Sequence, residues 1–271
     1  MKIMFWFKKK KIVLDCFTAD PFAFQYTPIS SATNYFPEWW KSMDSYFNTK
    51  NNENKDITMG SMKHCRGFID LYKNSFMIPY WGNLGIEVSD IIQKQYSWNT
   101  NFGSEYVKLN SKNNLEEHSP QFFKGFVDSN FQHVKLVSPW SLKTNRYVKF
   151  FMSDSLWNRN NLTNYSVLPG VIDFKYQLAS HVNLMFEYKN TSRIIKLKPN
   201  DPLVMLTPLT EEHIELKHHL VSIEELSKMF SFNRAYSNKY DFNSKKYHII
   251  KKFIDEHDKR NKPKCPFGFG K

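Results

Sequence analysis

Short apolar runs, separated by polar and turn-forming residues, recur along the chain and are most regular after residue 131. Runs of this length and spacing are typical of strands in compact β domains. The predicted strands cover residues 11–17, 76–81, 84–88, 93–98, 134–137, 147–152, 171–172, 182–188, 194–197, 203–206 and 213–216. Strict alternation in one of them predicts that Val182, Leu184 and Phe186 share a face. We therefore predict a mainly β protein.

Helical periodicity is confined to short segments. Pro37 at a first helical position favours a helix start. Trp40, Met43 and Phe47 then follow at helical spacing, which predicts one packed face. A second short helix is predicted over residues 65–73.

Ser222 and Glu225 have the spacing of a capping box, in which each residue bonds the other's backbone amide. This motif predicts a helix over residues 223–230, and a basic helix is predicted further on, over 241–260. Two segments carry turn residues or polar runs without periodicity. We expect residues 20–31 to be extended and residues 48–61 to form a mobile loop.

The block from Pro169 to Leu209 contains four segments in a distinctive order: Pro-Gly-Val-Ile-Asp, His-Val-Asn-Leu-Met-Phe-Glu-Tyr, Arg-Ile-Ile-Lys-Leu-Lys-Pro-Asn-Asp and Pro-Leu-Val-Met-Leu. This order resembles the third and fourth motifs of trimeric dUTPases, over roughly 40 of the 271 residues. The resemblance implies a dUTPase-like core of the β-clip or jelly-roll type. It also implies a homotrimer.

The same resemblance implies a nucleotide-like pocket. Asp173 matches the carboxylate that orients water, and Tyr176 lies near the ring that stacks on deoxyribose. Ser153 and Ser155 fall where active enzymes carry a Pro-Arg-Ser phosphate motif, but Asp154 replaces the arginine. Because a carboxylate repels a triphosphate, we expect no hydrolysis of dUTP or dCTP. The residues alone also allow Asp173 to be a turn residue whose carboxylate caps the backbone.

A broader resemblance rests on five segments spread along the chain: Tyr-Phe-Pro-Glu-Trp-Trp at 35–40, Cys-Arg-Gly-Phe-Ile-Asp at 65–70, Phe-Met-Ile-Pro-Tyr-Trp at 76–81, Pro-Trp at 139–140 and Pro-Gly-Val-Ile-Asp at 169–173. Their order resembles a family of uncharacterised proteins of tailed phages, especially cyanophage-like ones. The resemblance spans about residues 11–250. It implies a viral origin and carries no site residues.

Charge adds a candidate binding segment. The formal net charge is +12 and the sequence pI is about 9.4, which favours contact with polyanions. The surplus is concentrated at the two termini, and near the C-terminus it accompanies an apolar stripe at helical spacing. The candidate partner-binding residues are Lys245, Lys246, Tyr247, Ile250, Lys251, Lys252, Phe253 and Ile254. The stripe favours protein docking, and nucleic-acid contact through the basic termini is the alternative.

Other chemistries have little support in the sequence. The three cysteines are far apart, which indicates a reducing compartment without structural disulfides. His213, His218 and His219 lack a suitable spacing for one metal ion, so no metal and no cofactor are expected. No window approaches the roughly 20 apolar residues that span a bilayer, so no membrane contact is expected. We expect the protein in the host cytoplasm and then in the virion.

Three regions follow from these patterns. Residues 1–130 are predicted to form an N-terminal α/β elaboration, 131–221 the dUTPase-like core, and 222–271 a basic helical extension. The favoured function is a non-enzymatic virion structural or assembly component, whose core serves oligomerisation and docking on other phage structural proteins. The alternatives are a nucleotide-binding or dUTPase-like hydrolase and a nucleic-acid-binding accessory protein.

Overall fold

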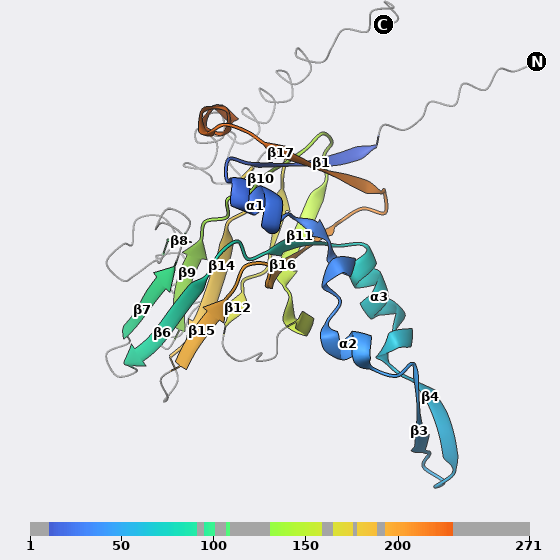
Figure 1. The fold of residues 1–271 in the computed structure, drawn as a ribbon. Helices are drawn as coiled ribbons and strands as arrows, with labels where there is room; N and C mark the ends of the chain where they lie inside the picture. Colours follow the sequence, from blue (N-terminus) through green and yellow to red (C-terminus); the bar gives the residue numbers. More distant parts are fainter. Residues whose placement is uncertain are drawn as a thin grey trace, which may run out of the picture.

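The computed structural model describes most of the first 229 residues: 11–90, 95–100, 107–108, 131–158, 165–175, 178–188 and 193–229. The described part is mainly β, as predicted (Figure 1). The predicted basic helix at 241–260 lies outside the described residues. The capping box is confirmed, because the Glu225 carboxylate accepts from the Ser222 amide at 3.0 Å and the Ser222 hydroxyl accepts from the Glu225 amide at 3.2 Å. A helix follows at 223–229.

The described strands form five sheets. The largest has the order β13–β11–β16–β5–β2, with bounds Gly170–Asp173, Lys149–Asp154, Pro202–Pro208, Phe76–Pro79 and Ser30–Ser31. A second has the order β12–β14–β9–β8, with bounds Ser166–Val167, Val182–Glu187, Phe131–Leu136 and Val107–Lys108. The three others are smaller: β10–β1–β17 (Ser141–Thr144, Ile12–Thr18, Ile214–Leu220), β15–β6–β7 (Arg193–Leu197, Leu84–Asp90, Gln95–Thr100) and β3–β4 (Tyr46–Lys50, Asp56–Gly60).

Strands from the two ends of the described chain lie side by side. β1 pairs in parallel with β17, from Ile12 opposite Ile214 to Thr18 opposite Leu220, and in antiparallel fashion with β10. β5 and β6, also from the N-terminal third, pair with the late strands β16 and β15. Residues 11–100 therefore supply strands to the same sheets as residues 131–221.

The helices of the N-terminal part are short. They are α1 (Pro21–Tyr26), α2 (Glu38–Ser42) and α3 (Arg66–Lys73), with 3-10 turns η1 (Ala32–Tyr35), η2 (Met62–His64) and, later, η4 (Leu156–Asn158). α3 confirms the predicted second helix, with Phe68 and Tyr72 buried. α2 begins as predicted after Pro37 but ends at Ser42, so Phe47 lies in a strand.

Two predictions about segments without regular structure are wrong. Residues 20–31 contain helix α1, because the Asp20 carboxylate accepts from the Phe22 amide at 2.9 Å and Pro21 supplies a preset first helical residue. Residues 48–61 lie largely in the β3–β4 hairpin instead of a loop. There, cross-strand pairing outweighs the polar composition.

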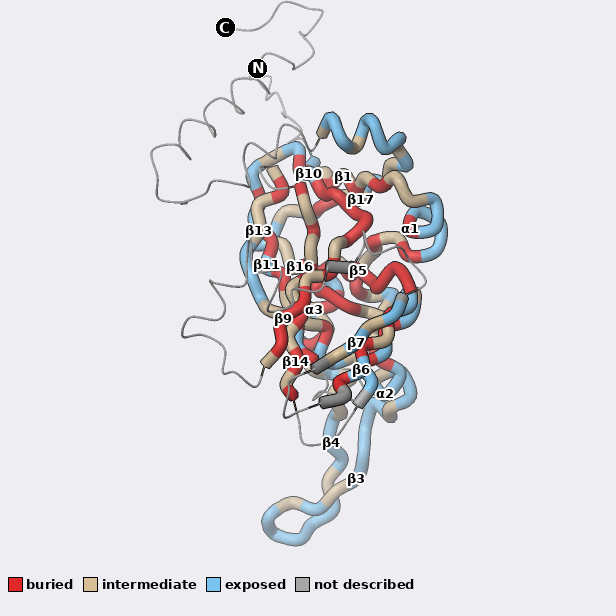
Figure 2. Tube along the Cα trace, turned by 90° about the vertical axis from the view of Figure 1, so that its left-hand side faces the viewer, coloured by how far each residue is buried: buried red, intermediate tan, exposed pale blue. Residues whose placement is uncertain are grey.

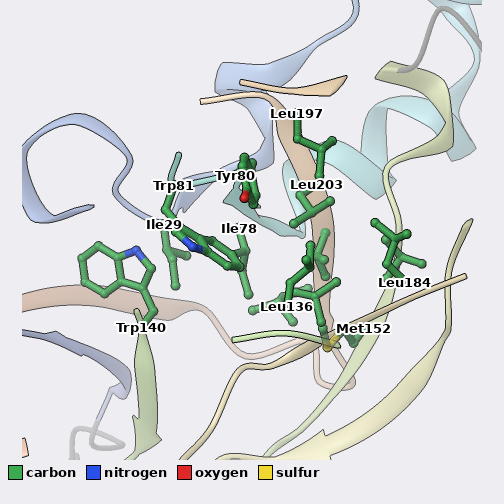
Figure 3. Close-up of a cluster of buried hydrophobic side chains, with 14 of the residues drawn as sticks. Ile29, Ile78, Tyr80, Trp81, Leu136, Trp140, Met152, Leu184, Leu197 and Leu203 are labelled. Atoms are coloured by element: carbon green, nitrogen blue, oxygen red, sulfur yellow. The ribbon is translucent and has the colours of Figure 1, made fainter. Parts of the chain in front are cut away.

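Most buried side chains belong to one cluster that joins the sheets. Figure 3 shows its centre, where Trp81 and Ile78 lie close to Leu136, Leu203 and other aliphatic residues from several strands. β14 confirms the predicted alternation, because Val182, Leu184 and Phe186 are buried whereas the residues between them are only half-buried. A smaller cluster of Ala32, Phe68, Tyr72, Met77 and Met205 packs α3 and η1 on the large sheet.

Tyr96, on β7, provides a test of packing between sheets. Its ring lies edge-on to that of Phe186 at 5.6 Å, and burial raises the pKa of its phenol to about 12. An unfolded tyrosine ionises near its ordinary pKa of 10.0. The stabilisation that protonated Tyr96 gives is therefore complete below pH 10, and is lost as the pH rises towards about 12.

We expect the free energy of unfolding to fall less steeply between pH 10 and 12 in Tyr96→Phe than in the wild type, because a phenylalanine at position 96 has no phenol proton to release. Urea unfolding at several alkaline pH values measures this difference. Tyr26→Phe, at an exposed position, is the matched control and should follow the wild type. Equal slopes for the wild type and Tyr96→Phe would contradict the burial of this phenol.

Candidate docking arm and the predicted pocket residues

The structure places Asp173 at the end of the edge strand β13. Lys149 is directly opposite it on β11. One carboxylate oxygen of Asp173 accepts from the Lys175 amide at 3.1 Å, the geometry of a turn closed by an aspartate side chain. The Asp173 carboxylate therefore closes its own turn. This is the structural role that the sequence allowed beside the catalytic one.

The two candidate serines lie at the other end of β11, Ser153 within the strand and Ser155 just after its last residue. Ser153 is four positions from Lys149, so strand rise separates it from the Asp173 end by about 13 Å. Ser155 is buried, and its hydroxyl donates to the Pro202 carbonyl at 2.6 Å. Asp154 accepts from the Val167 amide at 2.8 Å. The structure therefore does not bring Asp173 and these serines together, and Tyr176 lies outside the described residues.

The histidines near β17 also have structural partners. Nε2 of His218 lies 2.7 Å from the Ile29 carbonyl oxygen, and Nε2 of His219 lies 2.8 Å from an Asp15 carboxylate oxygen. Within the described ranges, no group of three or more His, Cys, Asp or Glu side chains is arranged to hold a metal ion. In the same ranges, no helix has the length and apolarity needed to cross a membrane. The candidate partner-binding residues 245–254 are not among those described.

The feature that stands out from the body of the molecule is the β3–β4 hairpin, which we call the arm (residues 46–60). Figures 1 and 2 show that it projects beyond α2 and α3, away from the sheets. Nearly all of its residues are exposed. An isolated two-stranded hairpin is only marginally stable in water, so its projection needs support at its base and at its tip.

Support at the tip comes from a five-residue turn. The Asn51 side-chain oxygen accepts from the Glu53 amide at 3.0 Å and from the Lys55 amide at 2.9 Å. Asn54 adopts a left-handed conformation with φ of 61°, which asparagine tolerates better than most residues. A salt bridge of 2.7 Å between Lys55 and Glu53 lies in the same turn.

At its base, the arm is held by backbone and aromatic contacts. The Ser61 amide donates to the Ser45 carbonyl at 2.9 Å, which closes the hairpin. Just beyond, the Trp40 indole donates to the Met62 carbonyl at 3.3 Å and stacks on Phe36 with ring centroids 4.3 Å apart. Because Phe36 also stacks on the buried Tyr72, the arm is anchored through this aromatic group to the large sheet.

The arm has one apolar face. Strand register places Phe47 opposite Met59, and Thr49 opposite Ile57, on one side. Phe47 is 48% exposed and Met59 is 46% exposed. On the other side, the Thr58 hydroxyl donates to the Asn48 side-chain oxygen at 2.9 Å, and the Tyr46 ring lies 4.7 Å from that of His64.

An exposed apolar face on a projecting ribbon is suited to binding a partner, because docking would remove these side chains from water. Shallow hollows lie beside the arm, one along Ile57 and Met59, and one at its base near Phe47 and Met62. Sequence reasoning missed this site. The available signal was the pair of short alternating runs around an Asn-rich turn, which is typical of a hairpin.

Comparison with known proteins adds no relative: no family model, no curated protein and no solved structure matches the chain. The dUTPase-like core and the phage family therefore stay predictions from the sequence.

Proposed function

We propose that this chain is a non-enzymatic assembly protein, a structural or assembly component of a phage virion, that docks on other proteins through the arm. The observation that carries the docking role is the exposed apolar face of Phe47 and Met59 on a hairpin that projects from the folded body. The resemblance to tailed-phage proteins supports the virion setting.

The arm favours a protein as the partner over a nucleic acid. The lysines of the arm do not gather into a cationic surface, because Lys50 lies opposite Asp56 in the strand register and on the other face from Phe47 and Met59. The tip lysine, Lys55, is engaged with Glu53. Phosphate groups bind where lysine and arginine side chains gather, whereas apolar residues on strand edges bind other proteins.

Particles purified from infected cells provide the test. We expect the wild-type polypeptide to be present in them, as measured by quantitative mass spectrometry. The double variant Phe47→Ser/Met59→Ser should be incorporated about tenfold less or lower, because each lost apolar contact at a docking centre costs about 1 kcal/mol or more. Both side chains are exposed, so the free protein should keep its thermal unfolding temperature.

Ile194→Ser is the matched control. Ile194 is an apolar side chain of similar exposure, 50%, on the distant strand β15, and its substitution should leave incorporation unchanged. Absence of the wild-type polypeptide from particles would refute the virion role. Equal incorporation of the wild type and the double variant would refute docking through the arm. The expected absence of dUTP and dCTP hydrolysis is a separate prediction.

A further inference from the structure

A second exposed apolar surface lies on the large sheet, at the edge formed by β13. Phe151 of β11 and Val171 of β13 are directly opposite each other, and they are 39% and 56% exposed. Leu209, 56% exposed, donates its amide to the Lys149 carbonyl at 2.9 Å and so continues the same side of the sheet. We call Phe151, Val171 and Leu209 the edge patch.

The edge patch lies beside the outer edge of β13. Among the described residues, β13 pairs with β11 alone and is the outer strand of its sheet. The same side of this sheet is covered by α3 farther along, where Met77 and Met205 pack under Phe68 and Tyr72. An exposed strand edge with an apolar row beside it is a ready template for an added strand.

The arm supplies such a strand. Its two strands are five residues long and β13 is four residues long, so either strand of the arm can pair along the whole of β13. In the described structure, β3 and β4 pair only with each other, which leaves the outer edge of each available for a further strand. Addition along β13 would place Phe47 and Met59 in line with Phe151 and Val171, because side chains on one face of a sheet continue across its strands.

The arm and the edge patch of one molecule do not meet. Figure 2 shows the arm projecting at the bottom of the molecule, whereas β13 lies on the side of the body, well above it. Because the arm and the edge patch lie apart on one molecule, they can contact each other only between two molecules. Such a contact is heterologous, and it closes into a ring, such as a trimer, or continues as a filament.

The geometry points to a second copy of this chain as the partner of the arm: the β3–β4 hairpin of one molecule adds to β13 of the next, with Phe47 and Met59 packed beside Phe151 and Val171. This inference rests on the docking role proposed above and names its partner. The contact surface is small, so assembly is reversible and depends on protein concentration.

Sedimentation velocity of the full-length protein over a range of concentrations tests the contact. We expect the wild type to self-associate. An arm variant, Phe47→Ser/Met59→Ser, and a patch variant, Phe151→Ser/Val171→Lys, should each be monomeric at the same concentrations. Ile194→Ser, which alters an apolar residue of β15, should associate like the wild type.

Mixing the two defective variants gives the decisive result. The patch variant keeps an intact arm and the arm variant keeps an intact patch, so an equimolar mixture should form one-to-one dimers and nothing larger. A mixture that stays monomeric while the wild type associates would overturn the inference, because it indicates an arm–arm contact or another surface. A far-UV circular dichroism spectrum equal to that of the wild type confirms that each variant is folded.

The result separates this inference from the docking function in general. If the wild type is monomeric at every concentration, the second copy is not the partner and the inference is wrong. The docking function then still stands if the arm variant is lost from particles, because the arm would bind a different protein.

Discussion

Replacement of Trp140 by alanine is expected to lower the free energy of unfolding by about 3–5 kcal/mol, the range for removal of a buried large aromatic side chain. Trp140 is 1% exposed. Its indole donates to the Thr27 carbonyl at 3.3 Å and its own carbonyl accepts from the Ser180 hydroxyl at 2.7 Å. The ring also lies edge-on to His218 at 5.6 Å. The substitution would therefore leave a cavity where the segment after α1, the start of β10 and β17 meet.

Urea unfolding followed by fluorescence or circular dichroism measures this loss. Trp140→Phe is the informative companion, because it keeps an apolar ring but removes the donor to the Thr27 carbonyl. We expect Trp140→Phe to lower the free energy of unfolding by about 1–3 kcal/mol, the cost of leaving the buried Thr27 carbonyl without its donor. This loss is smaller than that of Trp140→Ala. A Trp140→Ala variant as stable as the wild type would show that this junction is not packed as described.

The neighbouring phenylalanines of β11 are expected to differ sharply. Phe150 is fully buried and its ring lies 5.2 Å from that of Phe174, so Phe150→Ala should cost about 3–5 kcal/mol. Phe151 points to the other side of the sheet and is 39% exposed, so Phe151→Ala should cost about 1 kcal/mol or less in the monomer. The same substitution at adjacent positions thus measures which face of the strand is buried.

Denaturant unfolding at a concentration where the protein is monomeric keeps self-association out of this comparison. Equal losses for the two variants would mean that β11 is buried on both faces. A larger loss for Phe151→Ala than for Phe150→Ala would mean that the strand is shifted by one residue, since such a shift exchanges its two faces.

The sequence predicted the features that depend on residues close together in the chain. The alternation of Val182, Leu184 and Phe186 and the capping box at Ser222 could be read directly, because pleat and cap geometry follow from neighbouring residues. Asp173 was compatible with a catalytic carboxylate and with a turn residue. The structure shows the turn role, because one carboxylate oxygen of Asp173 accepts from the Lys175 amide at 3.1 Å.

By itself, the sequence determined that this protein is mainly β and where many of its strands lie. The tertiary structure alone decided that β1 pairs with β17, that Ser153 lies far along β11 from Asp173, and that the arm and the edge patch stay exposed. Strand formation depends on local pattern, whereas pairing between distant segments depends on which arrangement buries the most apolar surface overall. The apolar residues of the arm have the same pattern as core residues. Only their position outside that arrangement leaves them exposed for a partner.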